Sequence, residues 1–152
     1  MKSYAMDEII QRAIGKEEEV SSLYQDLSRR ITDPATRNLL KELSGEELKH
    51  KERLQDFQRR KADIGLGIKS LEDKRISDFL EKPVINKYAD AKDVMLAAIK
   101  DEEDTRVFYV SWAEFIIENE DVAGLLKKLG EEELKHKARL EERYKQVFSP
   151  EN

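Results

Sequence analysis

Apolar residues recur along four stretches of the chain at alternating steps of three and four, the spacing of an α-helix that buries one face. This pattern predicts four helices, over residues of about 5–31, 34–59, 91–118 and 122–148. Glutamates and histidines interrupt the apolar faces at regular places. The predicted buried positions, helix by helix, are Met6, Ile10, Ala13, Glu17, Val20, Tyr24, Leu27 and Ile31; Leu40, Leu43, Glu47, His50, Leu54 and Phe57; Met95, Ala98, Glu102, Thr105, Tyr109, Trp112 and Ile116; and Leu126, Leu129, Glu133, His136, Leu140, Tyr144 and Val147.

Two of the predicted helix starts carry capping signals. Thr32-Asp33-Pro34 offers a capping side chain followed by proline at the first helical position. Asp90, with Asp93 three residues later, is a weaker variant of a capping box. Only a few residues separate the first helix from the second and the third from the fourth, so the helices of each pair must be antiparallel neighbours.

A much longer segment, residues 60–90 in this prediction, joins the second helix to the third. It contains the helix breaker Pro83 and a short helix predicted over Ser70–Lys82. A helix of about 26 residues spans about 39 Å, and a link of this length can cross that distance. We therefore predict one all-α domain over residues 1–152, an antiparallel four-helix bundle with a long crossover between helices two and three.

The two halves of the chain repeat each other. The stretch from Leu39 to Lys51 matches the stretch from Leu125 to Lys137, and both contain Glu-Leu-Lys-His. The helices that precede them also match, in Ala13, Ile14, Glu17 and Tyr24 of the first half and Ala98, Ile99, Glu102 and Tyr109 of the second. Each half is one helical hairpin, and we expect a pseudo-two-fold axis between them.

Composition excludes several classes of protein. The 152 residues carry a formal net charge of -5, so there is no basic excess to neutralise nucleic-acid phosphates. No apolar run approaches the roughly 18–20 residues of a membrane span, and the first residues do not resemble a secretory signal, so we expect a cytoplasmic protein. Cysteine is absent, which excludes disulfides, thiolate catalysis, iron–sulfur clusters and cysteine-based zinc sites.

Both histidines of the chain follow a glutamate by three residues. Residues at this spacing share one helix face, so a carboxylate oxygen and an imidazole nitrogen can meet at one point. Four glutamates lie on the predicted buried faces, where unpaired carboxylates are costly, and these faces offer no lysine or arginine at the same levels. Two divalent metal ions would balance the charge. The predicted ligands are Glu17, Glu47, His50, Glu102, Glu133 and His136.

Each of these assignments has a plainer alternative. A single glutamate on a helix is almost always solvated, and only the register of six residues across a repeat favours a metal site. Tyr24 and Tyr109 fit two roles equally well, as donors to a ligand carboxylate or as core packing. Carboxylate and imidazole ligands suit iron or manganese, and zinc would also bind. The neighbouring glutamates interpreted as solvated are Glu18, Glu19, Glu46, Glu103, Glu131 and Glu132, with Glu103 or Glu132 as the nearest alternative ligands.

From about Met6 to Val147 the chain resembles the ferritin-like superfamily and, within it, the rubrerythrin-like di-iron carboxylate proteins. The resemblance implies two iron ions, each with one histidine, bridged by Glu47 and Glu133, with the glutamates of the first and third helices as more terminal ligands. The residues that carry it are Ala13-Ile14-x-x-Glu17 with Tyr24, Glu47-x-x-His50, Ala98-Ile99-x-x-Glu102 with Tyr109, and Glu133-x-x-His136.

The resemblance also implies an activity. Rubrerythrins reduce hydrogen peroxide to water at such a site, usually with electrons from a rubredoxin domain that carries four cysteines, and this chain has none. Many also place an extra carboxylate one turn after the third-helix glutamate, where this chain has Thr105. Bacterioferritin resembles the ligand set equally well, but it carries a haem-binding methionine where Leu48 stands here.

Three functions are compatible with these residues. The first is a di-iron redox enzyme that reduces peroxide or dioxygen with electrons from an external electron-transfer protein, with no nucleic-acid or membrane partner and, by family habit, as a homodimer. The second is a ferroxidase or iron-storage protein, which requires a large closed oligomer. The third is a structural bundle with adventitious metal.

Overall fold

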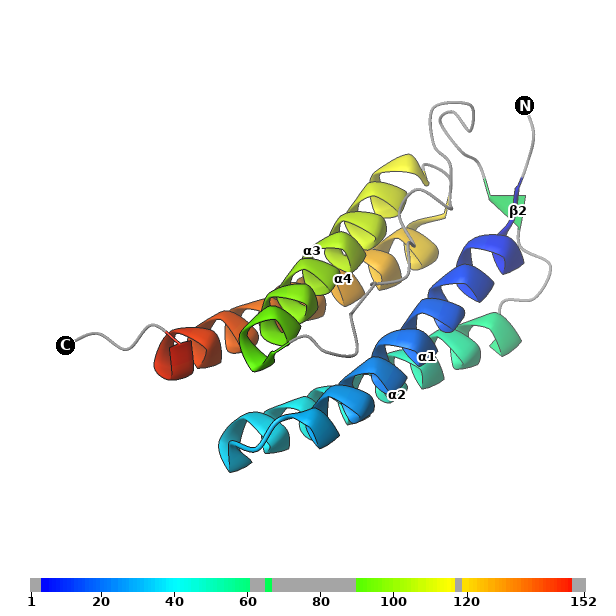
Figure 1. Cartoon of the computed structure of the whole chain (residues 1–152). Coiled ribbons are helices and arrows are strands. Elements are labelled where there is room, and N and C mark those ends of the chain that lie inside the picture. The colour runs from blue at the N-terminus through cyan, green and yellow to red at the C-terminus, as the bar shows by residue number, and fades with distance from the viewer. Residues whose placement is uncertain (1–3, 61–64, 67–89, 117–118, 149–152) are drawn as a thin grey trace.

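A computed structural model of the chain describes residues 4–60, 65–66, 90–116 and 119–148, in which four long helices and one small pair of strands form (Figure 1). The elements are β1 (Tyr4–Ala5), α1 (Met6–Arg30), α2 (Pro34–Arg60), β2 (Gly65–Leu66), α3 (Ala91–Phe115) and α4 (Glu120–Phe148). The strands β1 and β2 pair antiparallel. The four helices match the predicted ones to within a few residues at each end.

Two of the helices begin at the predicted caps. The backbone N–H of Thr36 donates to the Asp33 carboxylate at 2.9 Å at the start of α2. At the start of α3 the N–H of Asp93 donates to the Asp90 carboxylate, also at 2.9 Å. In both cases an aspartate satisfies a backbone donor that the first turn of a helix leaves unpaired.

The turn between α3 and α4 differs from the prediction at both ends. The helix α4 starts at Glu120, two residues before its predicted start, because the Asn119 side chain accepts the N–H of Val122 at 3.1 Å and so acts as its cap. The helix α3 ends at Phe115, short of the predicted end at residue 118. Positions 117 and 118 lie outside the described residues.

The helices form two antiparallel hairpins, α1 with α2 and α3 with α4 (Figure 1). Between the hairpins, Tyr24 contacts Glu102 while Tyr109 contacts Glu17, so α1 and α3 run in opposite directions. It follows that α2 and α3 run in the same direction, and the chain between them must travel the length of the bundle. The predicted crossover is therefore confirmed, whereas the short helix predicted at Ser70–Lys82 lies outside the described residues.

Two apolar clusters fill the interior, one toward each end of the helices, with a polar layer between them. The predicted buried faces are confirmed wherever the structure describes the side chains, except that Tyr144 and Val147 are only half-buried. The side chain of Met6 lies outside the described part of the chain. None of the helices described has both the length and the apolar character that crossing a membrane requires.

Candidate metal centre

Six polar side chains from all four helices meet in the layer between the two apolar clusters. The helices α1 and α3 each supply one glutamate, and α2 and α4 each supply a glutamate and the histidine three residues later. The alternating three- and four-residue spacing puts all of them on the buried faces, and each is at most 4% exposed. These are the six residues predicted from the sequence: Glu17, Glu47, His50, Glu102, Glu133 and His136.

The six residues divide into two overlapping groups of four. Within each group, one potential ligand atom from every residue lies within 4.8 Å of the others. Glu47 and Glu133 belong to both groups, so their carboxylates lie between the two sets. The groups are Glu17, Glu47, His50 and Glu133, and Glu47, Glu102, Glu133 and His136.

Both imidazole rings turn their Nδ1 atoms toward the carboxylates. Nδ1 of His50 lies 3.0 Å from Oε1 of Glu133, and Nδ1 of His136 lies 2.7 Å from Oε1 of Glu47. The two rings stack with their centroids 5.4 Å apart and their planes 4° from parallel. Each histidine therefore reaches a glutamate of the other hairpin, and Nδ1 is the nitrogen that faces the centre of the cluster.

The glutamates of α1 and α3 each accept a hydrogen bond from a fully buried tyrosine of the other hairpin. The hydroxyl of Tyr24 donates to Glu102, and the hydroxyl of Tyr109 donates to Glu17 at 2.5 Å. Burial, followed by the charge of these carboxylates, raises the pKa of both phenols well above the usual value. Both phenols therefore keep their protons and act as donors to predicted ligand carboxylates.

Four carboxylate oxygens of the cluster have no hydrogen-bond partner among the described residues, namely Oε2 of Glu17, Glu47, Glu102 and Glu133. An imidazole Nδ1 lies 3.5–3.6 Å from three of them, which is too far for a hydrogen bond. Leaving a buried acceptor unpaired is costly. Divalent cations would satisfy these oxygens, because carboxylate and imidazole ligands suit iron and manganese. The residues present thus fit a two-ion site.

Protons compete with cations in this cluster. Burial, together with the charge of Glu47, raises the pKa of Glu17 from 4.5 to about 8, and burial raises the pKa of Glu133 well above its usual value. Burial alone would lower the pKa of the imidazoles, but the surrounding carboxylates raise it to about 10 for His50 and about 12 for His136. A metal ion must displace these protons, so its affinity falls as the pH falls.

One buried ion pair next to the cluster corrects the sequence-based expectation. Nζ of Lys16 lies 2.9 Å from Oδ1 of Asp101, and the two side chains are 1% and 3% exposed. The expectation that no lysine lies at the level of the glutamates is wrong, because Lys16 directly precedes Glu17. The charge argument survives the correction, since the positive charge of Lys16 is matched by Asp101 and does not balance the four clustered glutamates.

Two glutamates that were interpreted as solvated instead face the outer sides of the histidines. Oε2 of Glu132 lies 3.0 Å from Nε2 of His50, and Oε1 of Glu46 lies 3.9 Å from Nε2 of His136. Each of these glutamates precedes the histidine of its own helix by four residues and so lies near the same helix face, but this spacing does not predict the contact with the histidine of the other hairpin.

An arginine holds each of these outer glutamates. Arg53 contacts Glu132 at 2.6 Å, and Arg139 contacts Glu46 at 2.7 Å. The same residues line a cavity of about 390 Å³ between α2 and α4, beside both histidines. Two lysines complete the lining, Lys49 and Lys135. The outer nitrogens of both imidazoles therefore face a cavity with a charged lining.

Glu103, the other alternative ligand, does not join the cluster. It accepts hydrogen bonds from Arg106 at 3.0 Å and from Lys137 at 3.1 Å, and its side chain is 33% exposed. The hydrogen bond from Arg106 is the main reason why the pKa of Glu103 falls to about 2. The register that places Glu102 in the cluster therefore holds.

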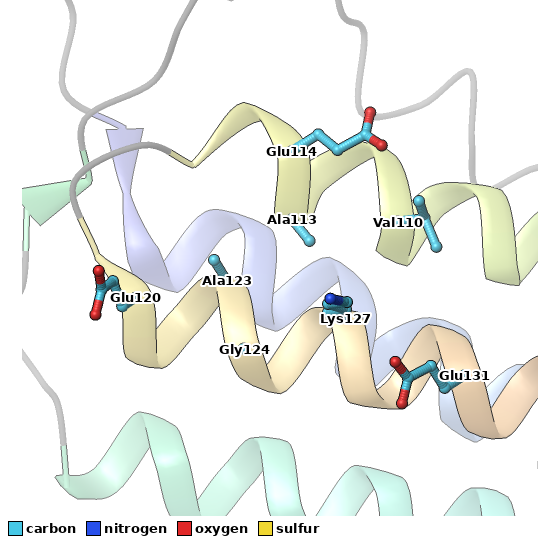
Figure 2. A pocket seen from close by; sticks show the side chains of 8 residues that line it. All are labelled: Val110, Ala113, Glu114, Glu120, Ala123, Gly124, Lys127 and Glu131. Carbon is cyan, nitrogen blue, oxygen red and sulfur yellow. The ribbon is translucent and has the colours of Figure 1, made fainter.

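A second cavity, of about 450 Å³, lies between α3 and α4 (Figure 2). Val110 and Ala113 of α3 lie on one side of it, and Ala123 and Lys127 of α4 lie on the other. Its lining contains no histidine and none of the six clustered residues. This cavity is therefore separate from the candidate metal centre.

Comparisons with known proteins agree with this fold. The rubrerythrin family model matches residues 93–152. No curated protein matches the sequence. Among solved structures, a protein from Thermotoga maritima described as a ferritin-like diiron-carboxylate protein has a TM-score of 0.69 and 22% identity, covering 95% of this chain and 97% of that chain. A hypothetical protein from Pyrococcus furiosus has a TM-score of 0.67 and 21% identity, covering 93% and 89%.

The solved structures and the family model support different statements about this chain. The solved structures share the fold, and at these identities they show no more than that. The family match covers α4 and nearly all of α3, including Glu102, Glu133 and His136, and the internal repeat supplies the corresponding residues of the first hairpin. The chain therefore has the ferritin-like fold, and its second hairpin is similar to rubrerythrin.

Proposed function

We propose that this protein is a di-iron carboxylate redox protein that reduces hydrogen peroxide or dioxygen with electrons from an external donor. The observation that carries the proposal is the pair of overlapping four-residue groups that share Glu47 and Glu133. The rubrerythrin match over the second hairpin and the likeness to a protein described as diiron-carboxylate favour iron over manganese or zinc.

The overlap of the two groups assigns a role to each ligand. Glu47 and Glu133 would bridge the two ions because they belong to both groups. The remaining glutamates would each bind one ion, Glu17 on the side of His50 and Glu102 on the side of the other histidine. Each histidine would bind through Nδ1, the nitrogen that faces the carboxylates.

Two bound ferrous ions would supply the two electrons that, with two protons, convert one hydrogen peroxide molecule into two water molecules. The phenols of Tyr24 and Tyr109 orient Glu102 and Glu17 by donating to them. The apolar clusters on both sides of the layer exclude water, and the cavity between α2 and α4 brings small molecules to the histidine side. The 152 residues contain no cysteine and so cannot hold a rubredoxin-type iron centre, and we propose that an external electron-transfer protein supplies the electrons.

The test uses anaerobic protein loaded with two ferrous ions per chain. In a stopped-flow instrument, one equivalent of hydrogen peroxide should oxidise both ions rapidly, as read from the near-ultraviolet absorbance of ferric carboxylate centres. Reduced rubredoxin should then return the protein to the ferrous state and support further turnovers. Glu133→Gln should abolish the fast phase, and Glu103→Gln, a matched change of a glutamate outside the cluster, should leave it intact.

Two outcomes would contradict the proposal. Failure to bind two iron ions per chain would remove its basis. Uptake of many ferric ions per chain by a large closed oligomer, measured by iron titration with size-exclusion chromatography, would assign the site to iron storage instead.

A further inference from the structure

Charged residues around the histidines follow the same pattern in both hairpins. A glutamate precedes each histidine by four residues and an arginine follows it by three. Each glutamate faces the histidine of the other hairpin, and the arginine next to that histidine holds the glutamate in place. The two sets are His50, Glu132 and Arg53, and His136, Glu46 and Arg139.

The two sets differ in the contact that matters most for a metal ligand. Nε2 of His50 lies 3.0 Å from the Glu132 carboxylate, which is hydrogen-bond distance. Nε2 of His136 lies 3.9 Å from the Glu46 carboxylate, which is too far for a hydrogen bond. Only the first histidine therefore has a carboxylate oxygen this close to its outer nitrogen.

One of the charge differences between the repeats offers a cause for the longer distance. Arg139 contacts Glu46 at 2.7 Å through one nitrogen and Glu42 at 3.0 Å through another, so it holds Glu46 on the side away from the histidine. In the other hairpin the position equivalent to Glu42 is Lys128. Arg53 then has no second carboxylate at that position and contacts Glu132 alone among the interactions described.

We infer that the two halves of the metal centre are inequivalent, and that the half containing His50 holds a divalent ion more tightly because Glu132 fixes its imidazole. Glu132 is a positioning residue, since it acts through the histidine, and Glu42 weakens the corresponding contact in the other half. A carboxylate on the outer nitrogen of a ligating histidine fixes its orientation and raises its basicity, and its loss costs about 10- to 100-fold in metal affinity. This inference rests on the metal site proposed above.

The size of the expected effect follows from exposure. The side chains of Glu132 and Glu46 are 29% and 35% exposed, so water screens both contacts, and we expect a difference near the lower bound, about tenfold. Metal-free protein titrated with Co²⁺ and followed by visible absorption and calorimetry should therefore bind two ions in two steps whose affinities differ by about tenfold.

Matched variants separate the two halves. Glu132→Gln should weaken the tighter step by about tenfold, whereas Glu46→Gln, the equivalent change in the other half, should alter neither step by more than about twofold. Exchanging the charge near each arginine should bring the affinities of the two steps closer together. Lys128→Glu should weaken the tighter step, and Glu42→Lys should strengthen the weaker one.

The outcomes distinguish the inference from the proposed function. If the wild-type protein binds two Co²⁺ ions with equal affinity, or if Glu132→Gln and Glu46→Gln have equal effects, the inequivalence is refuted and the two-ion site stands. If the protein does not bind two ions at all, the proposed function fails together with the inference. Lys128 is exposed, so Lys128→Glu supplies a test in a folded protein even if a substitution closer to the histidines disturbs folding.

Discussion

Replacing Asp101 with asparagine should destabilise the protein far more than its small change in shape would imply. Asp101 pairs with Lys16 at 2.9 Å between α1 and α3, and the second oxygen of its carboxylate has no hydrogen-bond partner among the described residues. Asparagine fills the same space but removes the negative charge. The ammonium of Lys16, which is 1% exposed, would then be buried without this counter-ion.

The loss of stability in Asp101→Asn depends on how deeply the ion pair is buried. Breaking a buried pair by removing one partner costs about 3–5 kcal/mol. In a protein of this size each kcal/mol lowers the melting temperature by about 2–4 °C, so Asp101→Asn should lower it by about 6–20 °C. Lys100 and Asp104 form a pair of nearly the same length, 2.8 Å, with side chains 76% and 49% exposed. Because exposed pairs contribute little, Asp104→Asn should change the stability by less than about 1 kcal/mol.

The assay is thermal and urea unfolding of metal-free protein in the presence of a chelator, so that ion binding does not contribute. Lys16→Met, Asp101→Leu and the double variant that combines them form a double-mutant cycle. The double variant should recover most of the stability lost in Asp101→Asn, because an apolar pair of similar volume carries no uncompensated charge. If Asp101→Asn costs no more than Asp104→Asn, burial does not control the energy of this pair and the reasoning is refuted.

Three further results are expected. Tyr109→Phe removes the donor to Glu17 and should weaken metal binding by up to about tenfold, measured by Co²⁺ titration; an unchanged affinity would show that the phenol does not orient the ligand. Loading both sites at 100 times the dissociation constant should stabilise the fold by about 2.7 kcal/mol per site, measured by calorimetry with and without chelator, and no shift would contradict native-state binding. Hydrogen bonds from Thr36 and Arg143 lower the pKa of Asp33 from 3.8 to about 2, so its ionised form adds stability above about pH 4 that is lost as the pH falls through about 2. The melting-temperature difference between wild type and Asp33→Asn should therefore shrink as the pH falls from 5 to 2, and a difference as large at pH 2 as at pH 5 would contradict this assignment.

The sequence located the six clustered residues because two independent patterns agree on them. Helical periodicity puts Glu47 and His50 on a buried face, and the repeat puts Glu133 and His136 at the same place in the second hairpin. The start of α4 was less predictable, since capping by Asn119 moves the start of a helix by two residues without changing its periodicity.

The residues that the sequence did not locate lie at the edges of the buried faces. Lys16 and Asp101 are one residue away from predicted ligands, so periodicity places them off the face, and their partnership across 85 residues appears only when the hairpins pack. Glu46 and Glu132 also directly precede ligands. The outer nitrogens of the histidines point toward this edge. Glu132 and Glu46 each contact the histidine of another helix, and spacing within one helix cannot predict a contact between α2 and α4.

Duplication within one chain explains why these edge positions carry opposite charges. Lys16 and Asp101 occupy the same position in the two hairpins, each directly before the glutamate that the hairpin's first helix contributes, and they contact each other across the pseudo-two-fold axis. Two identical hairpins related by a true axis would bring two lysines or two aspartates together there, at a large cost in buried like charge. A single chain can place lysine on one side and aspartate on the other. In the same way, Glu42 lies next to Arg139, whereas Lys128 occupies the equivalent position in the other hairpin. The first departure from symmetry, Lys16 and Asp101, stabilises the packing of the hairpins. The second distinguishes the two halves of the cluster.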